Sequence, residues 1–213
     1  NGFDVVLTNP PFGTKKGGER ANRDDFTFQT SNKQLNFLQH IYRSLKADGK
    51  ARAAVVLPDN VLFADGEGER IREDLMNKCS LHTVLRLPTG IFYAQGVKTN
   101  VLFFEKGEPT KDIWVYDYRT GIKHTMATKP MTRAHLQDFV DCYKTGAIQD
   151  RKATYDKDTN PNGRWRCFTE EEVKNADNLD FKWLDLEEKD ERTIAEILDD
   201  MQAESDGIAE AVS

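Results

Sequence analysis

The stretch FDVVLTNPPF, residues 3–12, is a run of apolar and β-branched residues that ends at an Asn-Pro-Pro sequence. Its apolar residues do not alternate with polar ones, which is typical of a strand buried on both faces of a parallel sheet. The two prolines stop the strand because neither has the N–H group that a neighbouring strand would need. The polar residues 13–32 predict a long loop of the kind that often carries function. We therefore expect an open α/β sheet that contains this strand.

Alternating helix and strand patterns continue this sheet along the chain. Residues 33–46 and 68–78 have apolar side chains at helical spacing, and residues 51–58, 81–88 and 99–107 predict further strands. Only about ten residues join the last two strands, too few for a helical crossover, so we expect that pair to be antiparallel. Two helices cannot cover both faces of this sheet. The sequence thus predicts the second half of a doubly wound, Rossmann-like, mostly parallel α/β domain, whose first half precedes this chain.

The chain changes character after Gly107. Residues 112–126 predict a hairpin that turns at Thr120-Gly121. Residues 132–146 predict a helix with an apolar stripe and a glycine at its end. The part of the chain beyond the sheet is therefore expected to be mainly helical, with one hairpin.

The last third of the chain contains a polar linker at 150–163. Thr169 and Glu172 then form the pattern of a capping box, which opens a short helix. The acidic segment 187–204 predicts an amphipathic helix, whose apolar side we expect to pack on this chain or, as the second choice, on a partner. We accordingly divide the chain into half of a catalytic domain, a hairpin-and-helix extension, and a linker with a C-terminal helical segment that is a possible subunit contact, at residues 1–107, 108–149 and 150–213.

The composition limits the classes of function. The chain has 213 residues with a net charge of −6, and its apolar runs are too short to cross a bilayer. No signal segment opens the sequence, so we expect a cytoplasmic protein that has no membrane partner. Its three cysteines and four histidines are scattered, which predicts a reduced compartment and no metal site. A nucleic-acid substrate would need another chain or a local basic patch to contact its phosphates, because the chain as a whole is acidic.

Asn9, Pro10 and Phe12 lie just beyond the carboxyl end of the first strand, where open α/β sheets bind ligands. The Asn9 side-chain oxygen and the Pro10 carbonyl can each accept a hydrogen bond, and Phe12 offers a flat face for stacking. Two fixed acceptors beside an aromatic ring suit a planar base that bears an NH2 group. Accepting both N–H groups leaves the nitrogen lone pair available to attack an electrophilic methyl group. The alternative is a strand end broken by prolines, with Phe12 in the core.

Several stretches together resemble a known enzyme family. The stretch TNPPF is similar to the (N/D/S)PP(Y/F/W) motif of amino-group methyltransferases that use S-adenosylmethionine. The wider resemblance covers most of residues 3–185 and is to the modification (M) subunit of Type I restriction-modification systems, an N6-adenine DNA methyltransferase. It rests on the stretches GKARAAVVLPDNVLF (49–63), LPTGIFYAQGVKTNVLFFEKG (87–107), WVYDYRTG (114–121), MTRAHLQDFVDCY (131–143) and RWRCFTEEEV (164–173).

The resemblance implies roles for the residues of this motif. Asn9 and the Pro10 carbonyl would hold the target amine, and Phe12 would stack on an adenine flipped out of the duplex. Asn9 and Pro11 would border the methyl donor, S-adenosylmethionine. A second aromatic would contact the other side of the base, and basic residues of the loop would contact phosphates. The candidates for these two roles are Phe92 and Tyr93 for the base, and Lys15, Lys16, Arg20 and Arg23 for the phosphates.

The resemblance also implies partners. These are double-stranded DNA, a specificity (S) subunit that reads the sequence, and a restriction (R) subunit. In this family a glycine-rich loop and an acidic residue that bind the donor lie upstream of the motif, and neither is present here, so this chain alone is expected to be inactive. Two alternatives stay open from the sequence: a non-catalytic assembly module that docks on a specificity subunit, and a methyltransferase for RNA or for protein glutamine.

Overall fold

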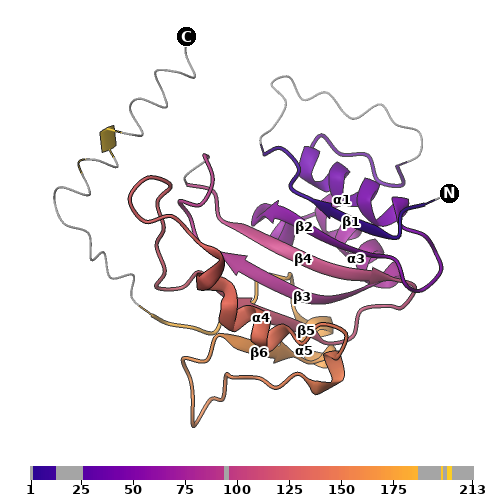
Figure 1. Cartoon of the computed structure of the whole chain (residues 1–213). Helices are drawn as coiled ribbons and strands as arrows, with labels where there is room; N and C mark the ends of the chain where they lie inside the picture. The colour runs from indigo at the N-terminus through magenta and orange to yellow at the C-terminus, as the bar shows by residue number, and fades with distance from the viewer. Residues whose placement is uncertain (1, 13–25, 94–95, 187–197, 199–200, 203–213) are drawn as a thin grey trace.

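The computed structural model describes residues 2–12, 26–93, 96–186, 198 and 201–202, which contain one six-stranded sheet (Figure 1). The order across the sheet is β1-β2-β4-β3-β5-β6, so β1 lies at an edge. The strands are β1 (Val5–Thr8), β2 (Arg52–Pro58), β3 (Cys79–Leu87), β4 (Thr99–Lys106), β5 (Ile113–Asp117) and β6 (Trp165–Phe168). β1 is parallel to β2 and β3 is parallel to β5, whereas β4 is antiparallel to both of its neighbours and β6 is antiparallel to β5. Four strands therefore run in one direction, and the antiparallel β3–β4 pair is confirmed.

Helices connect these strands, and local sequence signals fix where several of them begin. The helices of the described residues are α1 (Lys33–Ser44), α2 (Asn60–Phe63), α3 (Glu67–Lys78), η1 (Arg133–Leu136), α4 (Gln137–Tyr143), η2 (Ile148–Asp150) and α5 (Glu170–Asn175). Asn32 caps α1, because its side chain accepts a hydrogen bond from the Leu35 N–H at 3.1 Å. Thr169 and Glu172 form the predicted capping box of α5. The short α2 was not predicted from the sequence.

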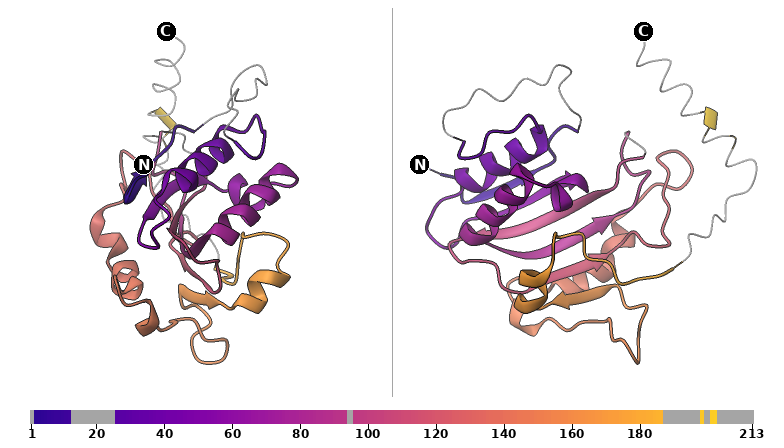
Figure 2. Two further views of the ribbon diagram at one scale, coloured as in Figure 1. Left: turned by 90° about the vertical axis from the view of Figure 1, so that its right-hand side faces the viewer. Right: turned by 180° about the vertical axis from the view of Figure 1, so that it is seen from behind.

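The helices lie on opposite faces of the sheet, which Figure 2 shows edge-on in its left view. α1 and α3 cover one face and enclose the larger core. On the other face, α4 lies over the middle of the sheet, where Phe139 packs against Phe103 and Trp165 at ring-centroid distances of 5.9 and 6.2 Å. The α/β architecture predicted from the sequence is confirmed.

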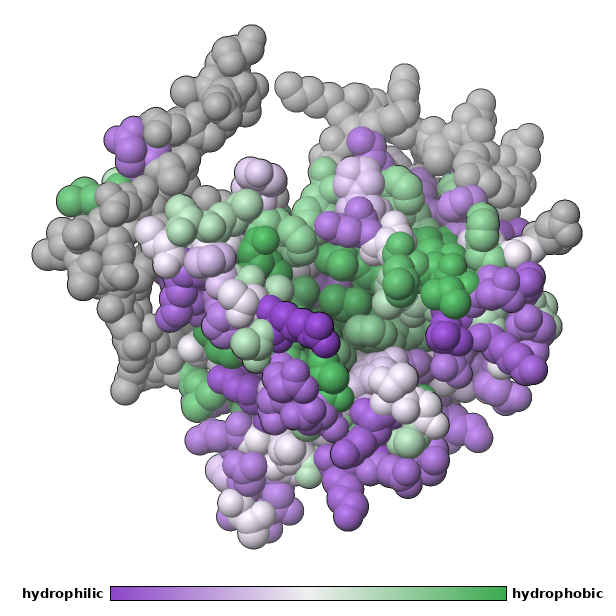
Figure 3. Space-filling model, viewed as in Figure 1, coloured by the Kyte–Doolittle hydropathy of each residue, from purple (hydrophilic) through white to green (hydrophobic). Residues whose placement is uncertain are grey.

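One face of β1 is bare. Side chains alternate along a strand, and Val6 packs into the α1 side, so Phe3, Val5 and Leu7 all point to the α4 side. They are 60%, 46% and 77% exposed. Figure 3 shows apolar surface gathered on this face of the sheet, to one side of α4. The strand that we predicted to be buried on both faces is therefore buried on one, because no described element packs over its other face.

Residues 112–126 do not form the predicted hairpin. The turn at Thr120-Gly121 is present, but β5 ends at Asp117 and pairs with β3 and β6, and residues 118–126 include no strand. The Asp117 carboxylate ends the strand by accepting hydrogen bonds from the N–H groups of Arg119 and Thr120. The extension predicted to be mainly helical thus adds β5 and β6 to the sheet, and the sheet continues across the predicted boundary at residue 107.

The predicted C-terminal helix at 187–204 lies outside the described residues except for three positions. Leu198 and Met201 are two of these, and they are 59% and 61% exposed. The packing of this segment stays a prediction, because most of it lies outside the described residues.

Candidate active site

The ends of several strands meet at one edge of the sheet. β1, β2, β3 and β5 run in one direction, so their carboxyl ends lie at the same edge, and β4 begins there. This edge carries Asn9–Phe12 after β1, Asp59 after β2, residues 88–93 after β3 and Arg119 after β5. Open α/β sheets bind their ligands at such an edge. The residues that the sequence singled out for chemistry therefore lie where a ligand site is expected.

Asn9 lies at the surface, and neither its side chain nor the neighbouring Pro10 carbonyl has a hydrogen-bond partner among the described residues. Pro10 is buried, whereas Asn9 and Pro11 are exposed. The buried proline ring fixes the backbone here, so the carbonyl direction is set by packing while the Asn9 amide stays accessible. Both oxygens are available to the N–H groups of a ligand.

Phe12 contacts Phe92, which comes from the loop after β3. Their ring centroids are 5.4 Å apart and their planes are inclined by 79°, an edge-to-face contact. A base stacked between two aromatic side chains needs both rings parallel to it and farther apart. Binding of a base between them would therefore require one ring to move. Tyr93, the other aromatic candidate, is 93% exposed, so of the two only Phe92 is brought to Phe12 by the structure.

The four basic residues predicted to contact phosphates, Lys15, Lys16, Arg20 and Arg23, lie outside the described residues. Within the part of the chain that the structure describes, no group of three or more His, Cys, Asp or Glu side chains could hold a metal ion. Among these same residues, no helix has the length and apolarity needed to cross a bilayer.

A buried polar network that the sequence reasoning missed lies at the same edge. Arg119 is 6% exposed, and its guanidinium donates to both carboxylate oxygens of Asp59 at 2.8 Å. The fully buried Asn100 donates to Asp59 at 2.7 Å. Burial lowers the pKa of the Arg119 guanidinium, which still carries its charge at neutral pH. Asp59 would be the obvious base at this edge, but both of its oxygens are held by these partners.

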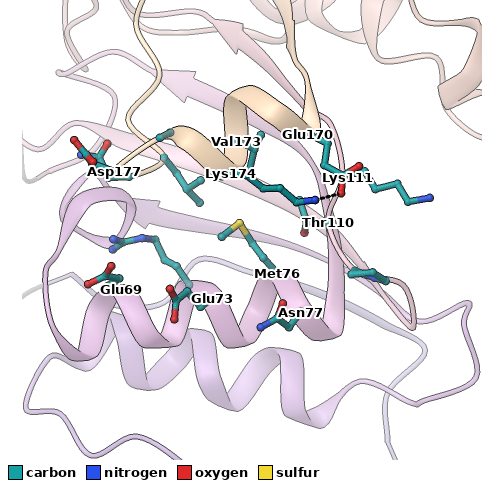
Figure 4. A pocket seen from close by; sticks show the side chains of 15 residues that line it. Glu69, Glu73, Met76, Asn77, Thr110, Lys111, Glu170, Val173, Lys174 and Asp177 are labelled. Carbon is teal, nitrogen blue, oxygen red and sulfur yellow. Dashed lines mark hydrogen bonds and ion pairs between the residues drawn. The ribbon is translucent and has the colours of Figure 1, made fainter.

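A cavity of about 430 Å³ lies between α3 and α5, on the α1 side of the sheet (Figure 4). Acidic and basic side chains alternate around it, among them Glu73, Lys111 and Lys174, and the Lys174 ammonium is paired with Glu170. None of the site residues predicted from the sequence lines this cavity. Its mixed charge is complementary to no single class of ligand, so the strand-end site is the stronger candidate.

Sequence comparisons group the chain with DNA methylases. The sequence model of the N-6 DNA Methylase family matches residues 1–188. The Type I restriction enzyme StySPI methylase subunit of Salmonella potsdam is 45% identical over 212 residues, which cover 85% of this chain and 39% of that subunit. The EcoKI methylase subunit of Escherichia coli K12 is 45% identical over 211 residues, with coverages of 84% and 39%. The chain thus spans 39% of the length of these two relatives.

Solved structures lead to the same group. The crystal structure of the Type I restriction enzyme EcoKI M protein matches with a TM-score of 0.75 and 42% identity, over 98% of this chain and 48% of that protein. The type I restriction-modification methyltransferase subunit of Streptococcus thermophilus matches with a TM-score of 0.63 and 28% identity, over 84% of this chain and 37% of that subunit. The mixed sheet is therefore the fold of Type I modification subunits, and this chain belongs to the N-6 DNA Methylase family.

Proposed function

We propose that this chain is the base-holding part of a DNA methyltransferase that transfers a methyl group to the N6 amine of adenine. The observation that carries the proposal is the pair of unpartnered oxygens, on Asn9 and Pro10, at the carboxyl end of β1 and next to Phe12. Membership of the N-6 DNA Methylase family supports an adenine amine in DNA as the target.

Asn9 and Pro10 act on the two hydrogens of the target amine. An amine attached to an aromatic ring shares its lone pair with the ring and is a weak nucleophile. When the Asn9 oxygen and the Pro10 carbonyl each accept one N–H group, electron density returns to the nitrogen and the amine becomes pyramidal. The nitrogen loses its extra proton only after it has been methylated, so the reaction needs no general base before attack. Both oxygens of Asp59 already accept hydrogen bonds from Arg119 and Asn100, which agrees with a reaction that uses no general base before attack.

Phe12 positions the base to which the amine belongs. An adenine within a duplex cannot reach the edge of the sheet, so it must be flipped out of the helix. Stacking on an aromatic side chain stabilises an unpaired base by about 1–3 kcal/mol. Phe92, now in edge contact with Phe12, is the side chain that lies close enough to contact the second face of the base after a rotation of its ring.

S-adenosylmethionine, when bound, supplies the electrophilic methyl group. Asn9 and Pro11 are the described residues that would border it, and no glycine-rich turn lies beside β1 among the described residues. These residues do not make a complete site for the donor. This chain matches only 39% of the length of the StySPI subunit. We therefore propose that most of the donor site lies in a part of the full protein that is not included in this chain.

We further propose that the full protein acts on double-stranded DNA in the cytoplasm, together with a specificity subunit and a restriction subunit. A similar structure, 30% identical over 99% of this chain, comes from work on complex assembly of the type I R-M system. The net charge of −6 supports the need for a partner, because phosphate contacts require basic residues. Within this chain, we propose residues 150–213 as the subunit contact. The loop residues proposed to contact phosphates are Lys15, Lys16, Arg20 and Arg23.

Methyl transfer from labelled S-adenosylmethionine to duplex DNA tests the proposal. The assay uses the full-length protein with its specificity subunit and compares wild type with Asn9→Ala. We expect a loss on the order of a hundredfold, the size seen when one oriented hydrogen-bonding group is removed from a reacting centre. Asn77→Ala is the matched control, because Asn77 is exposed in the last turn of α3, two residues before β3 begins at the opposite edge.

Two outcomes would overturn the proposal. Near-normal transfer by Asn9→Ala would remove the amine-holding role. Methylation of RNA or of a protein glutamine by the wild-type complex, with none of adenine in DNA, would replace the substrate class.

A further inference from the structure

Three stretches far apart in the sequence meet in the buried network at the site edge. Asp59 comes from VLPDN, Asn100 from VKTNV and Arg119 from DYRTG. Arg119 donates to both oxygens of Asp59, and its Nη2 also lies 3.3 Å from the side-chain oxygen of Asn100. The network therefore joins the end of β2, the beginning of β4 and the end of β5.

Arg119, which the Asp59 carboxylate orients, contacts both ends of the loop that carries Phe92. At the beginning of the loop, Arg119 Nε donates to the carbonyl of Leu87, the last residue of β3, at 2.8 Å. At its end, the Asp59 N–H donates to the Lys98 carbonyl at 3.0 Å. Arg119 Nη2 donates to the next carbonyl, that of Thr99, at 2.7 Å. The Arg119 side chain thus contacts both ends of the loop, and the main-chain N–H of Asp59 adds a bond at its end.

The middle of the loop is supported by the chain that follows Arg119. Gly90 has a φ of 79°, and a Cβ atom there would lie 1.8 Å from the carbonyl oxygen of His124. His124 is buried, and its ring is held by the Tyr118 hydroxyl at 2.8 Å and by the Lys129 carbonyl at 2.9 Å. The backbone at Gly90 therefore packs directly on the backbone of His124 and cannot move closer to it. Phe92 lies two residues after this contact.

The network orients its partner groups, which an apolar core of equal stability would not do. Removing an ion pair from water has a desolvation cost, and a well-packed apolar core can be equally stable. The Arg119 guanidinium, however, makes four short hydrogen bonds in fixed directions, to Leu87, Thr99 and both oxygens of Asp59, and its Nη2 has a longer contact with Asn100. An apolar side chain would hold none of these atoms in register.

We propose that Arg119, paired with Asp59, is a positioning residue that holds the Phe92 loop against Phe12 and so fixes the slot for the target base. The proposal rests on the function proposed above for Asn9–Phe12. Arg119 does not touch the base or the methyl donor in this role. It acts through the loop.

The test uses the full-length protein with its specificity subunit and a duplex that carries 2-aminopurine at the target adenine, after the target has been mapped as N6-methyladenine in the host genome. Arg119→Lys keeps the charge, but three ammonium hydrogens on one nitrogen cannot replace four bonds directed from three guanidinium nitrogens. Arg164→Lys is the matched control. Its guanidinium donates to the Asp117 and Thr120 carbonyls of the same turn and lies 3.9 Å from the Asp117 carboxylate, and among the described residues it donates to no atom of the Phe92 loop. Base flipping is read from 2-aminopurine fluorescence. Methyl transfer is read from the label on a second duplex with adenine at the target, because 2-aminopurine has no N6 amine, and donor binding is read from calorimetry.

We expect Arg119→Lys to lose about half or more of the fluorescence gain and to transfer methyl groups about tenfold more slowly, with unchanged donor affinity. Arg164→Lys should keep the fluorescence gain of the wild type. A full fluorescence gain in Arg119→Lys, or an equal loss in Arg164→Lys, would overturn the proposal. If Arg119→Lys also loses donor binding, Asp59→Asn decides: a selective loss of flipping supports the positioning role, and no selective loss overturns it.

Hydrogen exchange separates this proposal from the proposed function. Amides of residues 89–93 should exchange faster in Arg119→Lys than in Arg164→Lys whether or not DNA is methylated. Unchanged exchange there would overturn the positioning role even if the wild-type complex methylates adenine. A wild-type complex that transfers no methyl group to adenine would instead overturn the proposed function.

Discussion

We expect replacement of His82 by glutamine to remove much of the acid sensitivity of the folded chain. His82 is 6% exposed and lies at an irregularity in the pairing of β3 with β4. Arg151 Nη1 donates to Thr83 Oγ1 at 2.9 Å, and this oxygen lies 2.7 Å from His82 Nδ1. Because the Thr83 hydroxyl already accepts from Arg151, its own hydrogen can point to Nδ1, which favours the neutral imidazole.

The size of the effect follows from the pKa of His82. Burial, and after it the charge of Arg151, lowers this pKa from 6.5 to about 4. The unfolded chain then binds the proton more readily, so the contribution to stability is fully present above pH 6.5 and is lost as pH falls toward 4. The largest possible loss is about 3 kcal/mol at 1.36 kcal/mol per pKa unit. Between pH 7 and pH 5 the same linkage gives a loss of about 2 kcal/mol.

Denaturant unfolding at pH 7 and pH 5 measures this loss in three proteins. Wild type and His40→Gln should each lose about 2 kcal/mol more than His82→Gln between the two pH values. His40 is the matched control because it is exposed on α1. An NMR titration of ¹³C-labelled histidines should also show one imidazole, absent from His82→Gln, that stays neutral down to about pH 5. Equal losses of stability in all three proteins would refute the reasoning.

Three other substitutions test the packing, a helix cap and the bare face of β1. Phe139→Ala should lower the free energy of unfolding by about 3 kcal/mol, because its ring fills the aromatic cluster under α4; a loss below about 1 kcal/mol in denaturant unfolding would contradict this packing. Thr169→Ala should cost about 1 kcal/mol in the same assay, because it removes the capping box of α5, and a neutral result would mean that this cap does not hold in solution. Leu7→Ser should change stability by less than about 0.5 kcal/mol and reduce self-association in sedimentation, since this side chain is 77% exposed; unchanged association would show that copies do not meet at β1.

Local signals in the sequence were enough to predict those strands and helix ends that depend on neighbouring residues alone. The apolar run before Asn9 predicts β1, and the cap at Asn32 and the capping box at Thr169 mark where α1 and α5 begin. The predicted hairpin failed because β5 finds its partners elsewhere: it pairs with β3 upstream and with β6, which begins at Trp165. Nothing within 112–126 distinguishes a strand that pairs with its own continuation from one that pairs with distant strands.

The candidate site divides in the same way. Asn9 to Phe12 are contiguous, and their order along the chain already suggests an amine-binding turn. The ion pair of Asp59 and Arg119 joins residues 60 positions apart, and Asn100 lies 41 positions from Asp59. All three residues stand in stretches that carried the family resemblance, but only the strand order shows which of them meet.

The antiparallel direction of β4 is what allows one ion pair to control the Phe92 loop. β4 lies between β2 and β3 and runs against both, so the loop between β3 and β4 leaves the sheet and returns to it at the same edge. Both ends of the loop are therefore within reach of Arg119, which stands at that edge at the end of β5. In a parallel arrangement, β4 would begin at the opposite edge, and no single side chain could hold both Leu87 and Thr99. The short connection that predicted an antiparallel pair from the sequence thus also determines that the position of Phe92 depends on Arg119 and Asp59.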